Sequence, residues 1–184
     1  MRSKGALLIA LVVIMAGLAG CYGCTSYNGI VSSDEAVARA WADVENQYQR
    51  RADLVPNLID IVESAASIDK KLIEAVEESN EAVERLGAAD PSDQDALKRF
   101  AALQQRLSAS LTSLTRAVQG DQSIEAHRDL LVQLEGTENR IAVARRKYNE
   151  IVAEYNRTVR RFPRNVIAGL FGFEPRPAFT AEVK

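Results

Sequence analysis

Hydrophobic residues recur at alternating steps of three and four along the C-terminal part of the chain. The stepped positions are Leu131, Leu134, Glu138, Ile141, Arg145, Tyr148, Val152, Tyr155, Val159 and Phe162. Such heptad spacing is typical of a long helix that packs against other helices. We therefore predict a helix that begins near Asp121 or Ser123, continues to Arg161 and is ended by Pro163.

Two charged residues, Glu138 and Arg145, interrupt this apolar seam one heptad apart. They could extend their charged ends into solvent at the edge of the seam. Alternatively, they could form a buried polar pair that fixes helix register. A Tyr-Asn pair also repeats in heptad phase, at residues 148–149 and 155–156. This repeat predicts that both tyrosines lie on the seam and both asparagines beside it.

The same spacing predicts three further helices upstream. The first begins near Ser32, where Ser32 and Glu35 have capping-box spacing. Pro56 is expected to break or kink it, with Asp53 capping the second helix, although the heptad phase continues unbroken and one kinked helix is an alternative. The seam positions on either side of this proline are Val37, Trp41, Val44, Tyr48, Arg51, Val55, Leu58 and Val62.

The boundaries of the next helices are marked by glycine and by capping residues. The second helix is expected to end at Gly87, and Ser92 can cap the third. The third helix carries apolar residues to Val118 and stops at Gly120. Because short loops make successive helices antiparallel, the fold class is all-α, an antiparallel up-and-down four-helix bundle with long helices.

An apolar leader precedes the bundle. Residues 1–24 combine a basic start (Arg2 and Lys4), an apolar core and the sequence Leu18-Ala19-Gly20-Cys21. This sequence is typical of a bacterial lipobox, in which small residues precede the cut and the Cys21 thiol receives the lipid. The alternative is an uncleaved transmembrane anchor, since no charge occurs between Gly5 and Ser33. Residues 1–24 are thus a lipoprotein signal peptide or a membrane anchor with its linker, and residues 25–184 are the bundle with a short apolar tail.

Charge predicts which side of the membrane holds the bundle. Positive residues precede the apolar run and Asp34 and Glu35 follow it, so the bundle should lie outside the cytoplasm, in the periplasm or at the cell surface. The formal net charge of the whole chain is −2. A mildly acidic chain is a poor candidate for binding the phosphates of nucleic acid.

The sequence predicts that the protein is not an enzyme and holds no metal and no cofactor. Ser67 and Lys70 match S-x-x-K, but the companion motifs of serine acylases are absent. His127 is the only histidine. Cys21 and Cys24 form a C-x-x-C without the βαβ context of a redox site and without two further ligands for zinc.

The C-terminal end of the last helix is basic and then apolar. It carries Arg157, Arg160, Arg161 and Arg164, followed by an apolar segment with Phe171 and Phe173. One hypothesis is that these six residues form a membrane interface with anionic headgroups. The alternative is that the arginines complement the helix C-terminus and the tail folds back on the bundle. The acidic turn before the third helix should face the same membrane, which favours this alternative.

Two blocks of the sequence resemble the LemA family. One holds residues 138–142, the two Tyr-Asn pairs, Phe162-Pro163 and Gly172-Phe173; the other holds Tyr27-Asn28, Trp41 and residues 49–58. The resemblance implies a membrane-anchored bacterial four-helix bundle and brings no defined activity. We expect a scaffold or adaptor in cell-envelope assembly or maintenance, or alternatively a peptide- or lipid-binding module at the membrane surface. Its expected partners are membrane lipids through the anchor, and another protein or a second copy through helix faces.

Overall fold

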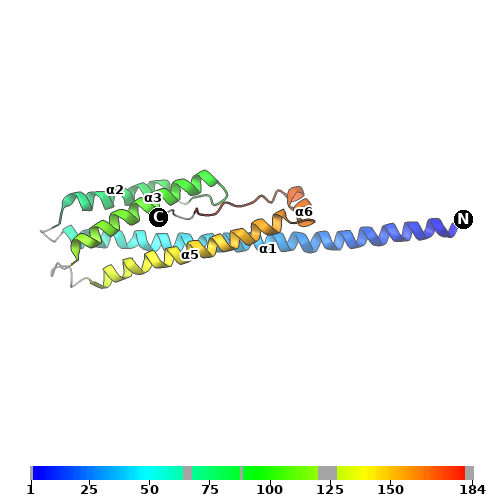
Figure 1. Ribbon diagram of the computed structural model, residues 1–184, viewed down its shortest axis with the longest axis horizontal. Coiled ribbons are helices and arrows are strands. Elements are labelled where there is room, and N and C mark those ends of the chain that lie inside the picture. Colours follow the sequence, from blue (N-terminus) through cyan, green and yellow to red (C-terminus); the bar gives the residue numbers. More distant parts are fainter. Residues whose placement is uncertain (1, 64–67, 88, 120–127, 181–184) are drawn as a thin grey trace. The chain divides into compact units, whose positions relative to one another are not determined.

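A computed structural model describes residues 2–63, 68–87, 89–119 and 128–180, with the backbone alone at 2–4, 6–9 and 19. All regular secondary structure in these ranges is helical (Figure 1). The helices are α1 (Arg2–Glu63), α2 (Lys70–Leu86), α3 (Gln94–Val118), α5 (Arg128–Arg160) and α6 (Arg164–Phe171). The prediction of an all-α bundle with an N-terminal apolar segment is confirmed.

The chain divides into two units. The anchor unit comprises Met1–Ala38 and Ile151–Arg176, and the bundle unit comprises Arg39–Glu150 and Pro177–Lys184. Helices α1 and α5 contribute residues to both units, whereas α2 and α3 belong to the bundle unit and α6 to the anchor unit.

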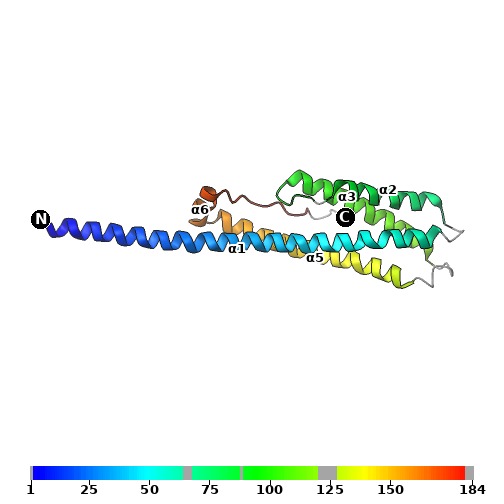
Figure 2. The ribbon, with the colours of Figure 1, turned by 180° about the vertical axis from the view of Figure 1, so that it is seen from behind.

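In the bundle unit, parts of α1, α2, α3 and α5 lie side by side, and successive helices run in opposite directions (Figures 1 and 2). All four helices contribute to one apolar core. Its buried members are Val55, Leu58, Val62, Ile73, Val76, Leu107, Leu111, Leu114, Val118 and Leu134. Heptad spacing placed these positions on the seams with the exception of Ile73, whose neighbour Leu72 was expected there and is only partly buried. Burial of apolar surface explains the pattern.

Pro56 lies inside α1, which continues to Glu63. The predicted break at this proline is therefore wrong, and one continuous helix is found. Val55 and Leu58 on either side of Pro56 are completely buried. Their burial offsets the cost of the missing N–H and of the ring clash in the preceding turn. The predicted start of the first helix at Ser32 is also wrong, because α1 begins at Arg2 and continues through Ser32 without interruption.

The ends of the shorter helices follow ordinary capping chemistry. Asp69 caps α2 by accepting a hydrogen bond from the Lys71 N–H, and Gly87 ends α2 with a φ of +68°. The Asp93 side chain caps α3, whereas Ser92 donates to Asp90 instead, so the prediction of Ser92 as the cap is wrong. The predicted turn at residues 120–123 lies outside the described residues.

In the anchor unit, α1 runs beside α6 and the C-terminal part of α5 (Figure 2). Pro163 follows the end of α5, as predicted, and α6 then ends at Gly172, whose φ is +74°. Phe162 was expected to be the last seam residue of α5. It is 78% exposed, because α5 ends at Arg160 and the chain turns away.

Candidate membrane-facing site

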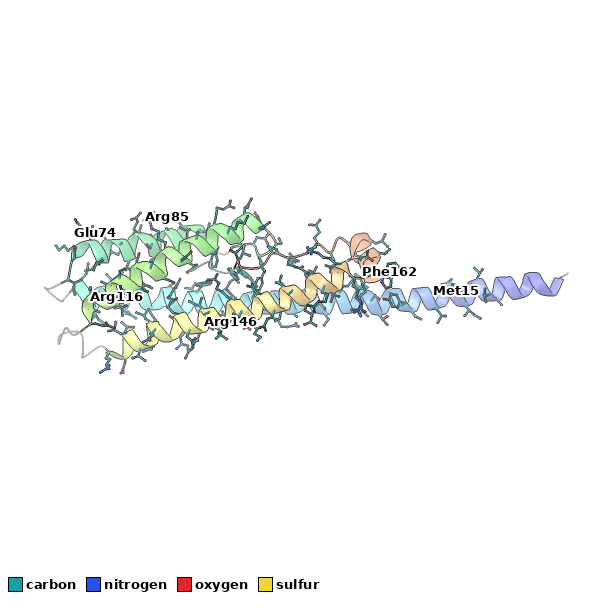
Figure 3. All side chains as sticks on the ribbon, viewed as in Figure 1. Met15, Glu74, Arg85, Arg116, Arg146 and Phe162 are labelled. Carbon is teal, nitrogen blue, oxygen red and sulfur yellow. The ribbon has the colours of Figure 1, made fainter. Side chains whose placement is uncertain are left out.

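The N-terminal part of α1 presents apolar side chains to its surroundings. Six large apolar residues are each at least 60% exposed: Leu11, Val12, Val13, Ile14, Met15 and Leu18. Met15 projects from a stretch of α1 that no other described element covers (Figure 3). This stretch is long and apolar enough to cross a membrane, and a signal sequence has the same character. The segment therefore indicates membrane anchoring or export.

Cys21 and Cys24 lie in α1 just after this stretch, and both thiols are exposed and free. Their exposure is compatible with lipid attachment at Cys21, which stays a prediction. The described residues contain no group of three or more His, Cys, Asp or Glu that could hold a metal ion.

Burial in α1 begins abruptly a short distance after the cysteines. Tyr22 is 44% exposed, whereas Ser26 is 2% exposed and Ile30 is completely buried. The Tyr27 ring contacts Phe171 and Phe173, with ring centroids 4.7 Å and 5.8 Å apart. Aromatic pairs at these distances are stabilising, so α6 and the residues after it are held against α1 at this level.

The four predicted arginines lie shortly before α6 or at its first residue. Arg157 and Arg160 occupy the last turn of α5, Arg161 lies in the turn that follows, and Arg164 begins α6. All four are exposed. Of the two predicted aromatic residues, Phe171 is 62% exposed and Phe173 is half-buried against Tyr27. The six predicted residues thus lie at the end of α5, in the turn before α6, in α6 and just after it.

An ion pair joins α1 to the chain segment after α6. Arg176 Nη2 lies 3.1 Å from Asp34 Oδ1, and both side chains are about two-thirds buried. Burial lowers the pKa of Arg176, but the hydrogen bond and charge of Asp34 outweigh this, and the net shift is upward. Burial also raises the pKa of the nearby Tyr155 phenol above 10.0, and the Asp34 carboxylate adds to the rise while Arg176 opposes it. No local pattern predicted this pair, because 142 residues separate its members.

The asparagines of the two Tyr-Asn pairs bind the backbone of the C-terminal tail. In the anchor unit, Asn156 Oδ1 accepts from the Arg176 N–H and its Nδ2 donates to the Arg176 carbonyl, at 2.7 Å and 2.8 Å. In the bundle unit, Asn149 makes the same two bonds with Phe179, both at 2.9 Å. The tail therefore folds back along α5, as the alternative to the membrane hypothesis required, while α6 keeps its exposed face.

The tail ends in an aromatic cluster of the bundle unit. Phe179 is 5% exposed and stacks on Trp41, with ring centroids 5.9 Å apart. Tyr148 contacts both rings and donates a hydrogen bond from its hydroxyl to the Pro177 carbonyl, at 3.1 Å. The Arg145 guanidinium lies over the Phe179 ring, 4.7 Å from its centroid. Trp41 and Tyr148 are thus core residues, as their seam positions predicted.

A polar network occupies the interior of the bundle unit. Arg51 is 1% exposed, and its Nη1 donates to Glu138 Oε1 and to Ser108 Oγ, both at 2.5 Å. Its Nη2 donates to the carbonyl and the side-chain oxygen of Gln104. The structure thus gives Glu138 a partner on another helix, where the sequence suggested Arg145. The opposite charges of Arg51 and Glu138 on two different seams were the signal that could have found this pair.

Comparison with protein-family models matches residues 40–184 to the LemA family. The chain belongs to the LemA family. A comparison with curated proteins gives no match. Membership in the LemA family, together with the exposed apolar helix, indicates a membrane-associated protein and does not by itself assign a molecular function.

Two residues weighed as catalytic candidates, Ser67 and His127, lie outside the described part of this LemA-family chain. Lys70, the partner of Ser67 in the S-x-x-K match, is the first residue of α2 and is exposed. The acidic side chains of α2 include Glu78, which pairs with Arg106, and Glu81, which pairs with Arg85. They behave as a solvated face rather than as a cation site.

Proposed function

We propose that this LemA-family protein is a non-enzymatic scaffold or adaptor that holds another envelope protein, or further copies of itself, at the membrane. One observation carries the proposal. The helix α1 supplies both the exposed apolar stretch of the anchor unit and the buried core positions Val44 and Val55 of the bundle unit. The apolar stretch and one of the four helices that form the bundle core are therefore parts of the same helix.

The interior of the bundle unit is filled by side chains, which favours a role that depends on the outer surfaces of the helices. Its core is filled by apolar side chains and by the network around Arg51. Two apolar residues on α5, Val132 and Val143, are 59% and 48% exposed and lie three helical turns apart. Because exposed apolar residues at such spacing share a helix face, we assign partner binding to this face of α5.

We also propose that the bundle lies outside the cytoplasm and that the anchor is lipidated at Cys21. The charge order around the apolar stretch and the sequence of residues 18–21 support these two points. Fatty-acid labelling such as palmitate incorporation, compared between the parent chain and Cys21→Ala, tests the lipid. Label retained by Cys21→Ala would exclude this attachment, and a retained transmembrane helix would then be the anchor. Protease treatment of intact spheroplasts tests the side of the membrane.

In-cell photocrosslinking tests the scaffold role. Photoreactive residues would replace Val132 and Val143, and the exposed Gln105 of α3 is a matched control position. A single dominant protein captured from the two α5 positions identifies an adaptor, and capture of the same chain identifies a self-assembling scaffold. If both α5 positions capture no more protein than the Gln105 position, the assignment to α5 is wrong. Ser67→Ala should leave the cellular function unchanged.

A further inference from the structure

We infer that α6 and the turn before it form a second membrane contact, which lies flat on anionic lipid headgroups beside the anchor. This inference requires only that the N-terminal segment anchors the chain in a bilayer. It does not depend on the scaffold role, and it adds a contact that membership in the LemA family does not assign.

The position of α6 along α1 matches the expected surface of the bilayer. A span of about 20 residues that begins after Lys4 ends near Cys24. Tyr27, against which Phe171 packs, follows about 5 Å later at 1.5 Å per residue. If Cys21 instead carries the lipid, Tyr27 lies about 9 Å from the attachment point. Under either anchor, α6 is held at headgroup depth.

The outer face of α6 is apolar, and the described residues of the anchor unit leave it uncovered. Ala168 is 2% exposed on the inner face. Three large apolar side chains are exposed on the outer face or in the turn before it: Phe162 at 78%, Val166 at 54% and Leu170 at 76%. Phe171, which contacts Tyr27, still leaves 62% of its surface exposed at the edge of this face. Phe162 projects outward beside α6 (Figure 3). A short amphipathic helix with aromatic and aliphatic residues on its outer face is typical of interfacial binding.

The charge around α6 selects an anionic surface. Between Tyr155 and Phe173 the chain holds four arginines and no acidic residue. Arg157 and Arg160 also complement the C-terminus of α5. Arg164 has no such explanation, because it begins α6, where the helix dipole disfavours a cation and the first turn carries no acidic residue. An anionic headgroup layer would compensate this placement.

Tryptophan fluorescence in bilayers of brominated lipid tests the inference on the full chain. Leu170→Trp places the probe on the outer face of α6, and Gln105→Trp is the control at an exposed position of α3. The native Trp41 is 5% exposed and supplies a constant background in both variants. The bilayers are phosphatidylcholine alone and phosphatidylcholine with phosphatidylglycerol at about three to one, which supplies the anionic surface.

We expect the emission of the added tryptophan in Leu170→Trp to be quenched by brominated lipid, more strongly in the anionic bilayer. The added tryptophan in Gln105→Trp should not be quenched. Each arginine near an anionic surface favours the bound state about fivefold, so Arg161→Gln with Arg164→Gln should shift the docking equilibrium about 25-fold. High salt should weaken the quenching of Leu170→Trp in a chain that keeps both arginines. This measurement tests the electrostatic attraction to the lipid without relying on the double arginine variant.

Three results would overturn the inference. The first is quenching of Leu170→Trp no greater than that of Gln105→Trp. The second is a blue-shifted but unquenched emission, which would show that a protein or a second copy covers α6. The third is quenching that is equal in both bilayers and unaffected by the arginine substitutions. None of these results bears on the photocrosslinking test of the scaffold role.

Discussion

Arg51 and Glu138 form an ion pair between α1 and α5 in the interior of the bundle unit, with Nη1 and Oε1 2.5 Å apart. The guanidinium is almost completely buried, whereas the carboxylate side chain is 42% exposed. A buried charge is costly unless its donors are satisfied. Glu138, Ser108 and Gln104 accept from Nη1 and Nη2 of Arg51, whereas its Nε is buried without a hydrogen-bond partner among the described residues. Since the pair joins one seam position on each helix, it fixes the register of α5 on α1.

We expect Glu138→Ala to destabilise the protein by about 1–3 kcal/mol, because it leaves the Arg51 charge buried with neutral acceptors only. We do not expect the largest losses of stability that follow the removal of one partner from a buried ion pair, because Glu138 is partly exposed. Arg51→Met, which replaces the buried charge with an apolar side chain, should cost less. Thermal unfolding of the full chain in detergent, followed by circular dichroism, measures both.

A double-mutant cycle separates the pair from the rest of the network. Glu138→Ala in the Arg51→Met background should have an effect smaller by about 1–2 kcal/mol than in the parent chain. Glu135→Ala, an exposed glutamate one turn earlier in α5, is the matched control and should change stability by less than about 0.5 kcal/mol. Additive effects of the two substitutions would show that the ion pair contributes nothing to the fold.

Periodicity predicted most of the core. Val44, Tyr148 and Val152 were placed on seams and are all buried. This succeeds because a heptad pattern is local, so a helix that buries one face records that face in its own sequence. Arg51 was also placed on a seam, although its charge alone would have favoured the surface.

The contacts between distant segments could not be predicted in the same way. Asp34 and Arg176 pair across most of the chain, and nothing near either residue records the other. The Tyr-Asn repeat could be seen in the sequence, but the segment that its asparagines bind could not. The C-terminal tail is bound through backbone groups, which every sequence contains. Seven residues of helix rise about 10.5 Å and three extended residues span about 10 Å, which explains why Asn149 and Asn156 bind residues three apart in the tail.

The asparagine contacts predict that Asn149→Asp weakens attachment of the tail. The aspartate can still accept from the Phe179 N–H, but it loses the donor and places a second oxygen against the Phe179 carbonyl. We expect a loss of about 1–2 kcal/mol and faster hydrogen exchange of the Phe179 amide. Asn139→Asp, at an exposed position of α5, is the control and should leave the exchange unchanged. Unaltered exchange in Asn149→Asp would contradict the role of the amide.

Tyr155 predicts a loss of stability at alkaline pH. Its hydroxyl is buried and has no hydrogen-bond partner among the described residues, and its pKa is raised above 10.0. The folded-state pKa lies above that of the unfolded chain. The stability that the neutral phenol contributes is therefore fully present below pH 10 and is lost as the pH rises through the folded pKa. Tyr155→Phe should therefore match the parent chain within about 0.5 kcal/mol at pH 7 and exceed its stability above pH 10.

Unfolding curves of Tyr155→Phe and the parent chain between pH 7 and pH 11 would measure this difference. Tyr22→Phe is the control, because Tyr22 is 44% exposed in the same unit. It should follow the parent chain at every pH. If Tyr155→Phe also follows the parent chain up to pH 11, the phenol is not protected from ionisation in the folded protein.

Pro56 predicts a substitution that stabilises the protein. It lies inside α1 with an exposed ring, and a proline in a helix interior costs about 3 kcal/mol through its missing N–H and the clash with the preceding turn. Pro56→Ala restores the N–H and removes the clash, while greater freedom of the unfolded chain takes back up to about 1 kcal/mol. We therefore expect a gain of about 2 kcal/mol in the free energy of unfolding, visible as a higher midpoint in thermal unfolding.

The neighbouring Asn57→Ala supplies the control for this gain. Asn57 is exposed in the same turn and keeps its backbone N–H, so its replacement should add only the difference in helix propensity, roughly 0.5 kcal/mol. A gain in Pro56→Ala no larger than in Asn57→Ala would mean that α1 already accommodates the ring without cost. A loss of stability would show that the proline sets a bend on which the packing of Val55 and Leu58 depends.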